Sequence, residues 1–361
     1  MSSISIPVFK PQAITQNQDK RFINIDILYL IGIVLVVLGH SHPISSDWYG
    51  TFVSDMNCFI YTFHMPLFFF IGGFLMVYSK SIEKSGYFKW AFQKILKFLI
   101  PYFILTLIAF YPKSLLGDTS DVVEFSFAYL FRTTVLIPRQ GIWGHFWFIP
   151  TFLTLDLIWG FWRSKVKNKF IYFYGLIIGT IVSLFLAIFP VINDLFVIYD
   201  ICQVAIFYAL GIIAALCKPT LWNSQLKNWV WIITCIPVAF LLYPYGNYVV
   251  RSWPIVNFIV GLLLVWVCWN FAQSVSHFKY SNLSTKFTQY NFTIFLYSWP
   301  AQSLLDVILR RIGINWVIIV FAMIVTGFLV PLLIIFLYRK ITFLNCKFLD
   351  YLLGIQTKSR S

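Results

Sequence analysis

The sequence is short of charge. Charged residues make up 11% of its 361 positions, whereas soluble domains carry about 25%. Hydrophobic residues make up 60%, and the mean hydropathy is +0.80. A chain with so few charges cannot cover a surface that faces water, so the composition excludes a soluble globular protein. We predict an all-α polytopic integral membrane protein.

Acidic residues are scarcer than basic ones, with 13 Asp and Glu against 27 Lys and Arg and a net charge of +14. The basic residues are not gathered on one domain, so this balance does not indicate a nucleic-acid partner. They recur instead as small clusters between hydrophobic runs, which is typical of the cytoplasmic loops of membrane proteins.

Several catalytic motifs are also missing. The sequence contains no GxSxG, P-loop, HExxH or paired CxxC motif. Most of its six cysteines lie inside apolar runs, which is typical of buried thiols. Its five histidines are not spaced as metal ligands. We therefore expect neither a metal nor a permanently bound cofactor.

Long apolar runs are abundant. A transmembrane helix needs about 20 apolar residues, and the sequence has room for about ten. The predicted spans are 23–42, 57–78, 92–112, 145–162, 170–190, 195–217, 229–244, 254–272, 291–309 and 316–338. No repeat or linker divides them. We expect an N-terminal tail (1–22), one transmembrane domain (23–340) and a C-terminal tail (341–361).

The basic clusters set the predicted orientation. They precede the first span, separate the second from the third and follow the last, whereas 43–56 contains none and 245–253 contains only Arg251. Arg310 and Arg311 interrupt this alternation. Because positive loops stay in the cytoplasm, we predict that both termini are cytoplasmic. The apolar stretch Phe125–Ile137 is expected to lie along the outer face or to dip into it.

The first span, IDILYLIGIVLVVLGHSHP (25–43), ends on His40 and His42. His40 lies about 25 Å along the helix from Ile23, near the outer rim of the membrane. An imidazole exchanges its proton near neutral pH and, when partly desolvated, acts as a general base. Two interpretations stay open here, a catalytic His40 and an interfacial histidine in contact with water.

The second span, FIYTFHMPLFFFIGGFLMVY (59–78), contains His64. Pro66 is expected to break the helix just after this histidine, and Gly72 and Gly73 permit close helix approach. Either His64 bonds a neighbouring carbonyl in a kinked, packed helix, or the kink opens a polar pocket that faces His40.

Two lysines begin the third span. Lys94 and Lys97 share one helix face, where they could bind the phosphates of a nucleotide-bearing ligand or simply anchor the helix at the cytoplasmic rim. In the fourth span, Trp147 is expected at the outer interface, and Asp156 needs a partner inside the membrane. Asp306, at a depth similar to His40, could orient its imidazole or pair with Arg310.

Five stretches, taken together, resemble the membrane acyltransferase family 3, the multispan acyltransferases that modify bacterial surface glycans. They are IDILYLIGIVLVVLGHSHP, FIYTFHMPLFFFIGGFL, KILKFLIPYF, HFWFIPTFL and NFTIFLYSWPAQ, and they cover roughly residues 20–305.

The resemblance implies that His40 is the essential histidine of the family and that Lys94 and Lys97 are the basic pair that holds an acyl-CoA donor. Two positions depart from the family pattern. Tyr29 stands where the family usually has Arg or Lys, although it lies on the same helix face as His40. Ser298 stands where the late helix usually has a histidine.

The resemblance thus implies an acyltransferase, most often an acetyltransferase, in the inner membrane of a bacterium. It would move the acyl group from cytoplasmic acyl-CoA to a hydroxyl of an extracytoplasmic or lipid-linked surface polysaccharide, such as a capsule or lipopolysaccharide. His40 would deprotonate the acceptor or carry the acyl group. The expected supporting residues are Tyr29, His64, Trp147, Asp26, Ser298 and Asp306.

A second function stays open. The same polar path could pass a glycan or a lipid-linked sugar without chemistry, as in a transporter or an export component. The losses of charge at Tyr29 and of the imidazole at Ser298 favour this alternative. A purely structural membrane scaffold is a third possibility, against which the intramembrane histidines argue.

Overall fold

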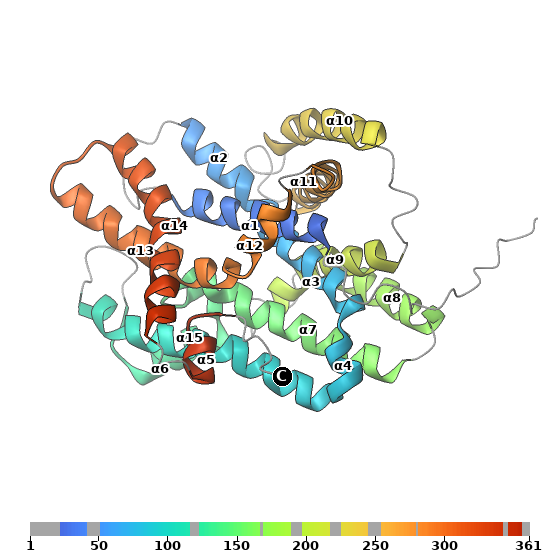
Figure 1. Ribbon diagram of the computed structural model, residues 1–361, viewed down its shortest axis with the longest axis horizontal. Coiled ribbons are helices and arrows are strands. Elements are labelled where there is room, and N and C mark those ends of the chain that lie inside the picture. The colour runs from blue at the N-terminus through green and yellow to red at the C-terminus, as the bar shows by residue number, and fades with distance from the viewer. Residues whose placement is uncertain are drawn as a thin grey trace, which may run out of the picture.

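The structure is a computed structural model that describes residues 22–41, 51–115, 123–166, 169–188, 197–216, 225–244, 254–278, 281–341 and 346–355 (Figure 1). All regular elements in these ranges are helices. The long ones are α1 (Ile23–His40), α3 (His64–Tyr78), α5 (Tyr87–Leu115), α7 (Phe148–Lys165), α8 (Lys169–Ile188), α9 (Ile198–Leu216), α10 (Gln225–Pro244), α11 (Pro254–Val275), α13 (Asn291–Arg311) and α14 (Trp316–Lys340). The shorter ones are α2 (Thr51–Tyr61), α4 (Lys80–Ser85), α6 (Phe127–Phe131), η1 (Arg132–Leu136), η2 (Pro138–Gln140), η3 (Gly144–Trp147), α12 (Asn282–Thr288) and α15 (Lys347–Leu352).

Each predicted span coincides with one of the long helices, the second one with α2 and α3 together. Seven segments of the described chain are long and apolar enough to cross a membrane: α1, 56–78, α5, α9, α11, α13 and α14. The prediction of an all-α polytopic membrane protein is therefore confirmed. The count of about ten spans and the cytoplasmic termini stay predictions.

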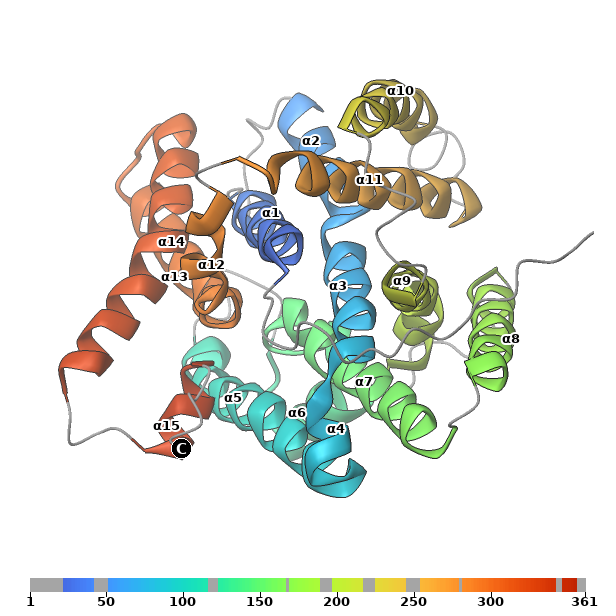
Figure 2. The same cartoon turned by 45° about the vertical axis from the view of Figure 1, so that its right-hand side comes forward.

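Helix α1 lies inside the bundle. It packs against α3, α11, α12 and α13, which surround it in both views (Figures 1 and 2). Helix α14 pairs with α13 on one side, α9 pairs with α3 on the other, and α5 pairs with α7. Because α1 is enclosed in this way, the side chain at its last position, His40, is directed among other helices.

Helices α3 and α9 touch backbone to backbone. A Cβ atom added at Gly73 would overlap the carbonyl oxygen of Tyr208, and one added at Gly211 would overlap the carbonyl oxygen of Phe70. Only glycine leaves enough room for this contact. The predicted close approach in the Gly72–Gly73 region is therefore confirmed.

The helix break near His64 was predicted at the wrong place. Helix α2 ends at Tyr61, a turn follows, and α3 begins at His64, so the break precedes this histidine. Pro66 lies in the first turn of α3. It is tolerated there because the first N–H groups of a helix have no intrahelical partner.

The connection between α5 and α7 is built from short helical pieces. Within it, α6 is followed by a π-helical turn, η1, and by two 3₁₀ turns, η2 and η3. Phe125 and Phe127 are exposed, as expected of an apolar segment that lies along a membrane face. Its place on the outer side stays a prediction. This connection delivers residues 143–147 to the end of α1.

Candidate active site

His40 is fixed by its own helix. It is 6% exposed, and its Nδ1 lies 2.7 Å from the carbonyl oxygen of Val36, one turn earlier. Because a carbonyl oxygen only accepts hydrogen bonds, Nδ1 carries the hydrogen of the neutral ring. The lone pair of the neutral imidazole is then on Nε2, which makes that nitrogen the candidate base.

Rings from three other elements surround His40. The ring centroids of Tyr61 and His145 each lie 5.7 Å from the imidazole, and that of Trp299 lies 6.0 Å from it. These residues belong to α2, η3 and α13. The imidazole of His40 is thus directed into the bundle.

His145 is a site residue that the sequence analysis left out. Both of its ring nitrogens are buried and have no hydrogen-bond partner among the described residues, while its ring lies 4.9 Å from Trp299. The signal was present, because His145 belongs to the stretch HFWFIPTFL that supplied Trp147.

A lysine lies at the same end of the bundle. The ammonium of Lys113 donates to the carbonyl of Ile142 at 2.6 Å. It also lies over the rings of Trp143 and Trp299, 4.4 and 5.3 Å from their centroids. These cation–π contacts bring α5, the connection to α7 and α13 together beside the two imidazoles.

Helix α13 is tied to the last turn of α1 by Gln302. Its Nε2 donates to the carbonyl of Val37 at 3.1 Å and to the hydroxyl of Ser41 at 2.8 Å, and it also lies 3.2 Å from the carbonyl of Met323 in α14. One turn before it, Ser298 is buried, and its hydroxyl has no partner among the described residues. The late stretch NFTIFLYSWPAQ therefore contacts the end of α1 through Gln302 and His40 itself through Trp299.

His64 packs on the same tyrosine, Tyr61, as His40 does. The Tyr61 ring is 4.9 Å from His64 and 5.7 Å from His40. Nδ1 of His64 lies 2.9 Å from the carbonyl oxygen of Ile60, which is the contact expected of a packed histidine. Its Nε2 is buried without a partner in the described part of the chain. This second nitrogen fits the other interpretation, in which His64 faces a polar pocket.

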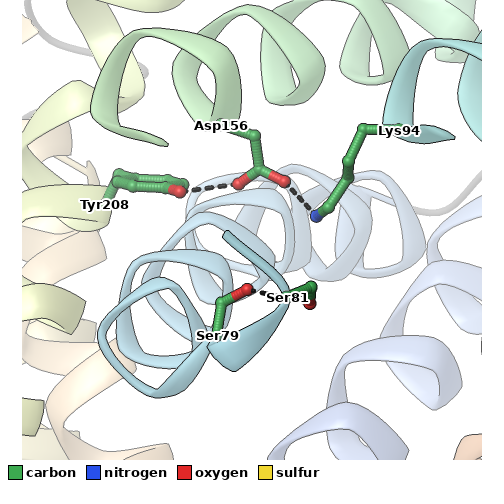
Figure 3. Close-up of polar contacts among 5 residues, drawn as sticks. All are labelled: Ser79, Ser81, Lys94, Asp156 and Tyr208. Atoms are coloured by element: carbon green, nitrogen blue, oxygen red, sulfur yellow. Dashed lines mark hydrogen bonds and ion pairs between the residues drawn. The ribbon is translucent and has the colours of Figure 1, made fainter. Parts of the chain in front are cut away.

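The buried carboxylate Asp156 has two partners. Lys94 forms an ion pair with Oδ2, and the hydroxyl of Tyr208 donates to Oδ1 at 2.6 Å. Figure 3 shows the carboxylate between these two groups, with one oxygen directed to each. One lysine of the predicted donor-binding pair is therefore already bound to a carboxylate. The ammonium of the other, Lys97, lies 5.8 Å from the ring centroid of Phe98.

The remaining predicted residues occupy separate places. In α1, Asp26 is buried in the first turn, and Tyr29 packs 6.2 Å from the ring of Phe68. Trp147 stacks on Phe69 at 6.3 Å, with the guanidinium of Arg139 over its ring at 4.0 Å. Asp306 accepts a hydrogen bond from Arg310 at 3.0 Å, one of the two partners considered for it.

No group of three or more His, Cys, Asp or Glu residues within the described ranges could hold a metal ion. The polar groups around His40 are imidazole, hydroxyl, amide and ammonium groups. Such a set can move a proton and donate hydrogen bonds to a developing negative charge.

Comparison with protein families gives one match. The model of the acyltransferase 3 family, described as an acyltransferase domain, matches residues 22–336. This range includes His40, His145, Trp299 and both lysines of the predicted donor site. Comparison with curated proteins and with solved structures gives no match.

Proposed function

The chain belongs to acyltransferase family 3, and on that premise we propose that it transfers an acyl group, most often acetyl, from cytoplasmic acyl-CoA to a hydroxyl of a surface polysaccharide. The acceptor is extracytoplasmic or lipid-linked, and the enzyme resides in the inner membrane of a bacterium. The observation that carries the proposal is the enclosed imidazole of His40, ringed by Tyr61, His145 and Trp299 at one end of α1.

His40 acts as the general base. Its Nδ1–H donates to the carbonyl of Val36, which holds the ring and puts the lone pair on Nε2, the atom that takes the proton of the acceptor hydroxyl. As the hydroxyl oxygen attacks the thioester carbon, its proton passes to Nε2. The carbon–sulfur bond then breaks, and the thiolate leaves with the proton that His40 has carried.

The donor enters at the opposite end of α5. Lys97 and Lys113 are 16 positions apart, which corresponds to about 24 Å along a helix. Lys113 packs on Trp299 beside His40, so the pair Lys94 and Lys97 lies far from the imidazole. We assign the donor phosphates to these two lysines. The ammonium of Lys94 has three N–H donors, so it can bind a phosphate while it keeps its ion pair with Asp156.

The acyl arm of the donor spans the distance between the two ends. Tyr29 is 11 positions before His40 on α1, about 16 Å along the helix. It packs on Phe68, and Trp147 packs on the neighbouring Phe69. We assign Tyr29, Trp147 and His64 to the lining of this path.

The substitution His40→Ala tests the proposal. We expect the variant to fold and insert but to form no O-acyl ester on the surface polysaccharide, because the acceptor proton has no base to receive it. The readout is the acetate released by alkali from purified polysaccharide. The matched control is His277→Ala, since His277 is an exposed histidine at the end of α11 and its loss should leave the ester content unchanged.

Ester content in His40→Ala cells equal to that of the parent would end the proposal. A second measurement separates transfer from transport, with labelled acetyl-CoA supplied to the purified protein. Movement of labelled acetate to polysaccharide with release of CoA supports the enzyme. Passage of polysaccharide without either product supports an export component instead.

A further inference from the structure

Two imidazoles lie side by side at the end of α1. The ring of His145 lies 5.7 Å from that of His40, and both lie against the indole of Trp299, at 4.9 and 6.0 Å. His40 has its Nδ1 bound to a carbonyl, whereas both nitrogens of His145 are buried without a partner among the described residues. A buried imidazole left in this state carries a free-energy penalty, which a bound reactant can relieve.

We propose that His145 is a second catalytic residue, whose ring N–H donates a hydrogen bond to the oxyanion that forms on the acyl carbonyl. The inference rests on the proposed function, since it assigns a role in the acyl transfer for which His40 is the base.

The charges around His145 select a donor role. The ammonium of Lys113 lies over the indoles of Trp143 and Trp299, and both indoles also pack on His145. A second positive charge in this buried place is unfavourable, so the ring is neutral and keeps one N–H. A neutral ring of low basicity is a poor proton acceptor but a good hydrogen-bond donor. Catalysis by a neutral histidine that polarises a carbonyl is chemically well founded.

Two other N–H donors at this end of the bundle are already in use. The indole N–H of Trp143 donates to the carbonyl of Leu105 at 3.1 Å. The side-chain amide of Gln302 lies within hydrogen-bond distance of three acceptors on α1 and α14. The N–H of His145 has no hydrogen-bond acceptor among the described residues. It is therefore available to stabilise a negative charge that develops during the reaction.

The reaction step balances as follows. The acceptor hydroxyl gives its proton to Nε2 of His40, and its oxygen forms a bond to the thioester carbon. The π electrons of the carbonyl move to its oxygen, which becomes the oxyanion held by His145 N–H. When the carbonyl re-forms, the carbon–sulfur bond breaks, and the CoA thiolate takes the proton from His40.

Two substitutions at position 145 separate this role from packing. His145→Phe keeps an aromatic ring and removes the donor, whereas His145→Gln keeps a side-chain N–H. Both are assayed in proteoliposomes with labelled acetyl-CoA and surface polysaccharide freed of its esters by alkali. Loss of an oxyanion donor lowers kcat by about 100-fold or more, so we expect that loss in His145→Phe, with the KM for acetyl-CoA within about twofold of the parent value.

We expect His145→Gln to recover at least about tenfold of that loss, because an amide N–H replaces the imidazole N–H. Equal losses in the Gln and Phe variants would overturn the donor role, as would an unchanged kcat with a raised KM. Both variants are first checked for the elution volume and thermal unfolding midpoint of the parent protein.

The experiments distinguish a failure of the role of His145 from a failure of the proposed acyltransferase function. If His40→Ala is inactive while His145→Phe keeps a kcat within about threefold of the parent, far from the expected loss, the inference about His145 is overturned and the acyltransferase stands. If the parent protein itself forms no ester from acetyl-CoA, the proposed function fails and the role of His145 fails with it.

Discussion

At the residue scale, Asp156 shows how a charge is held inside an apolar bundle. Its side chain is 2% exposed, and each carboxylate oxygen has its own partner, the ammonium of Lys94 or the hydroxyl of Tyr208. A buried carboxylate is tolerated only when its charge is paired and its lone pairs are hydrogen-bonded. The network thus explains why α7 can contain an acidic residue in its middle.

Removal of Lys94, the charged partner of Asp156, should show the free-energy cost of an unpaired buried carboxylate. Lys94→Met leaves the buried Asp156 unpaired, and we expect it to lower the free energy of unfolding by about 3–5 kcal/mol. The double variant Lys94→Met with Asp156→Asn should regain most of the loss, because neither charge remains and Tyr208 still has an oxygen to donate to. Unfolding of the purified variants in detergent measures both values.

The control is an ion pair at the surface. Arg163 and Glu83 are 3.0 Å apart, but the Glu83 side chain is 69% exposed, so Glu83→Gln should cost less than about 1 kcal/mol. A Lys94→Met variant as stable as Glu83→Gln would show that the Asp156 charge does not depend on Lys94.

Individual site residues differed in how far their roles could be predicted. His40 could be singled out because an ionisable side chain at the end of an apolar run is unusual. His145 was passed over, although it belongs to a stretch that resembles the family, because that stretch also has the composition of an aromatic belt and its contacts with His40 and Trp299 do not show in a local pattern. Lys94 was assigned to phosphates since nothing in the sequence joins it to Asp156, which lies 62 positions later.

At the scale of elements, the contact between α3 and α9 is the tightest that the glycines reveal. Gly73 and Gly211 each face a backbone carbonyl of the other helix, so neither helix can carry a side chain there without moving away. Tyr208, which binds Asp156, lies on α9 at this contact. The spacing of the two helices therefore also positions the polar network.

Gly211→Ala tests the contact. The new methyl group would overlap the carbonyl oxygen of Phe70, and backbone atoms cannot rotate out of the way as side chains do. We expect a loss of about 2–3 kcal/mol in the free energy of unfolding. Thermal unfolding in detergent, followed by circular dichroism, gives the measurement.

Gly179→Ala is the matched control, since Gly179 lies in helix α8 and its added Cβ would be 3.7 Å from Trp159, an ordinary contact. This variant should be neutral or more stable by about 0.5–1 kcal/mol, because alanine favours the helix. If the two variants behaved alike, the close approach of α3 and α9 would not limit stability.

At the scale of the whole molecule, the end of the chain folds back on the bundle. Helix α15 packs against α5, and three hydroxyl groups hold the C-terminal segment. Thr293 donates to the carbonyl of Leu353 at 2.7 Å, and Tyr297 donates to that of Leu352 at 2.9 Å. The hydroxyl of Tyr338 in α14 donates to Asp350 at 2.9 Å.

A chain that ends at Lys340 should be less stable than the full chain. It loses the three hydrogen bonds, and at roughly 1 kcal/mol for each we expect a total of about 3 kcal/mol. A chain that ends at Ile355 keeps all three and serves as the control. Equal unfolding midpoints for the two truncated chains would show that the C-terminal segment does not stabilise the bundle.

The sequence by itself determined where the helices lie and which residues are costly inside them. Each apolar helix satisfies its own backbone hydrogen bonds, so its position depends on local composition and is readable along the chain. The predicted spans therefore coincide with the long helices, and His40 stands at the end of the first. The break near His64 was misplaced because a proline in the first turn does not end a helix.

Only the tertiary structure decided which side chains meet. His145 joins His40, Lys94 joins Asp156, and Gln302 joins Val37 across 265 positions of sequence. These meetings depend on the angles and distances at which helices pack, and those are set by side-chain volume and by glycines on facing surfaces. The sequence shows which side chains each helix carries, and the packing of the helices decides which other side chains they contact.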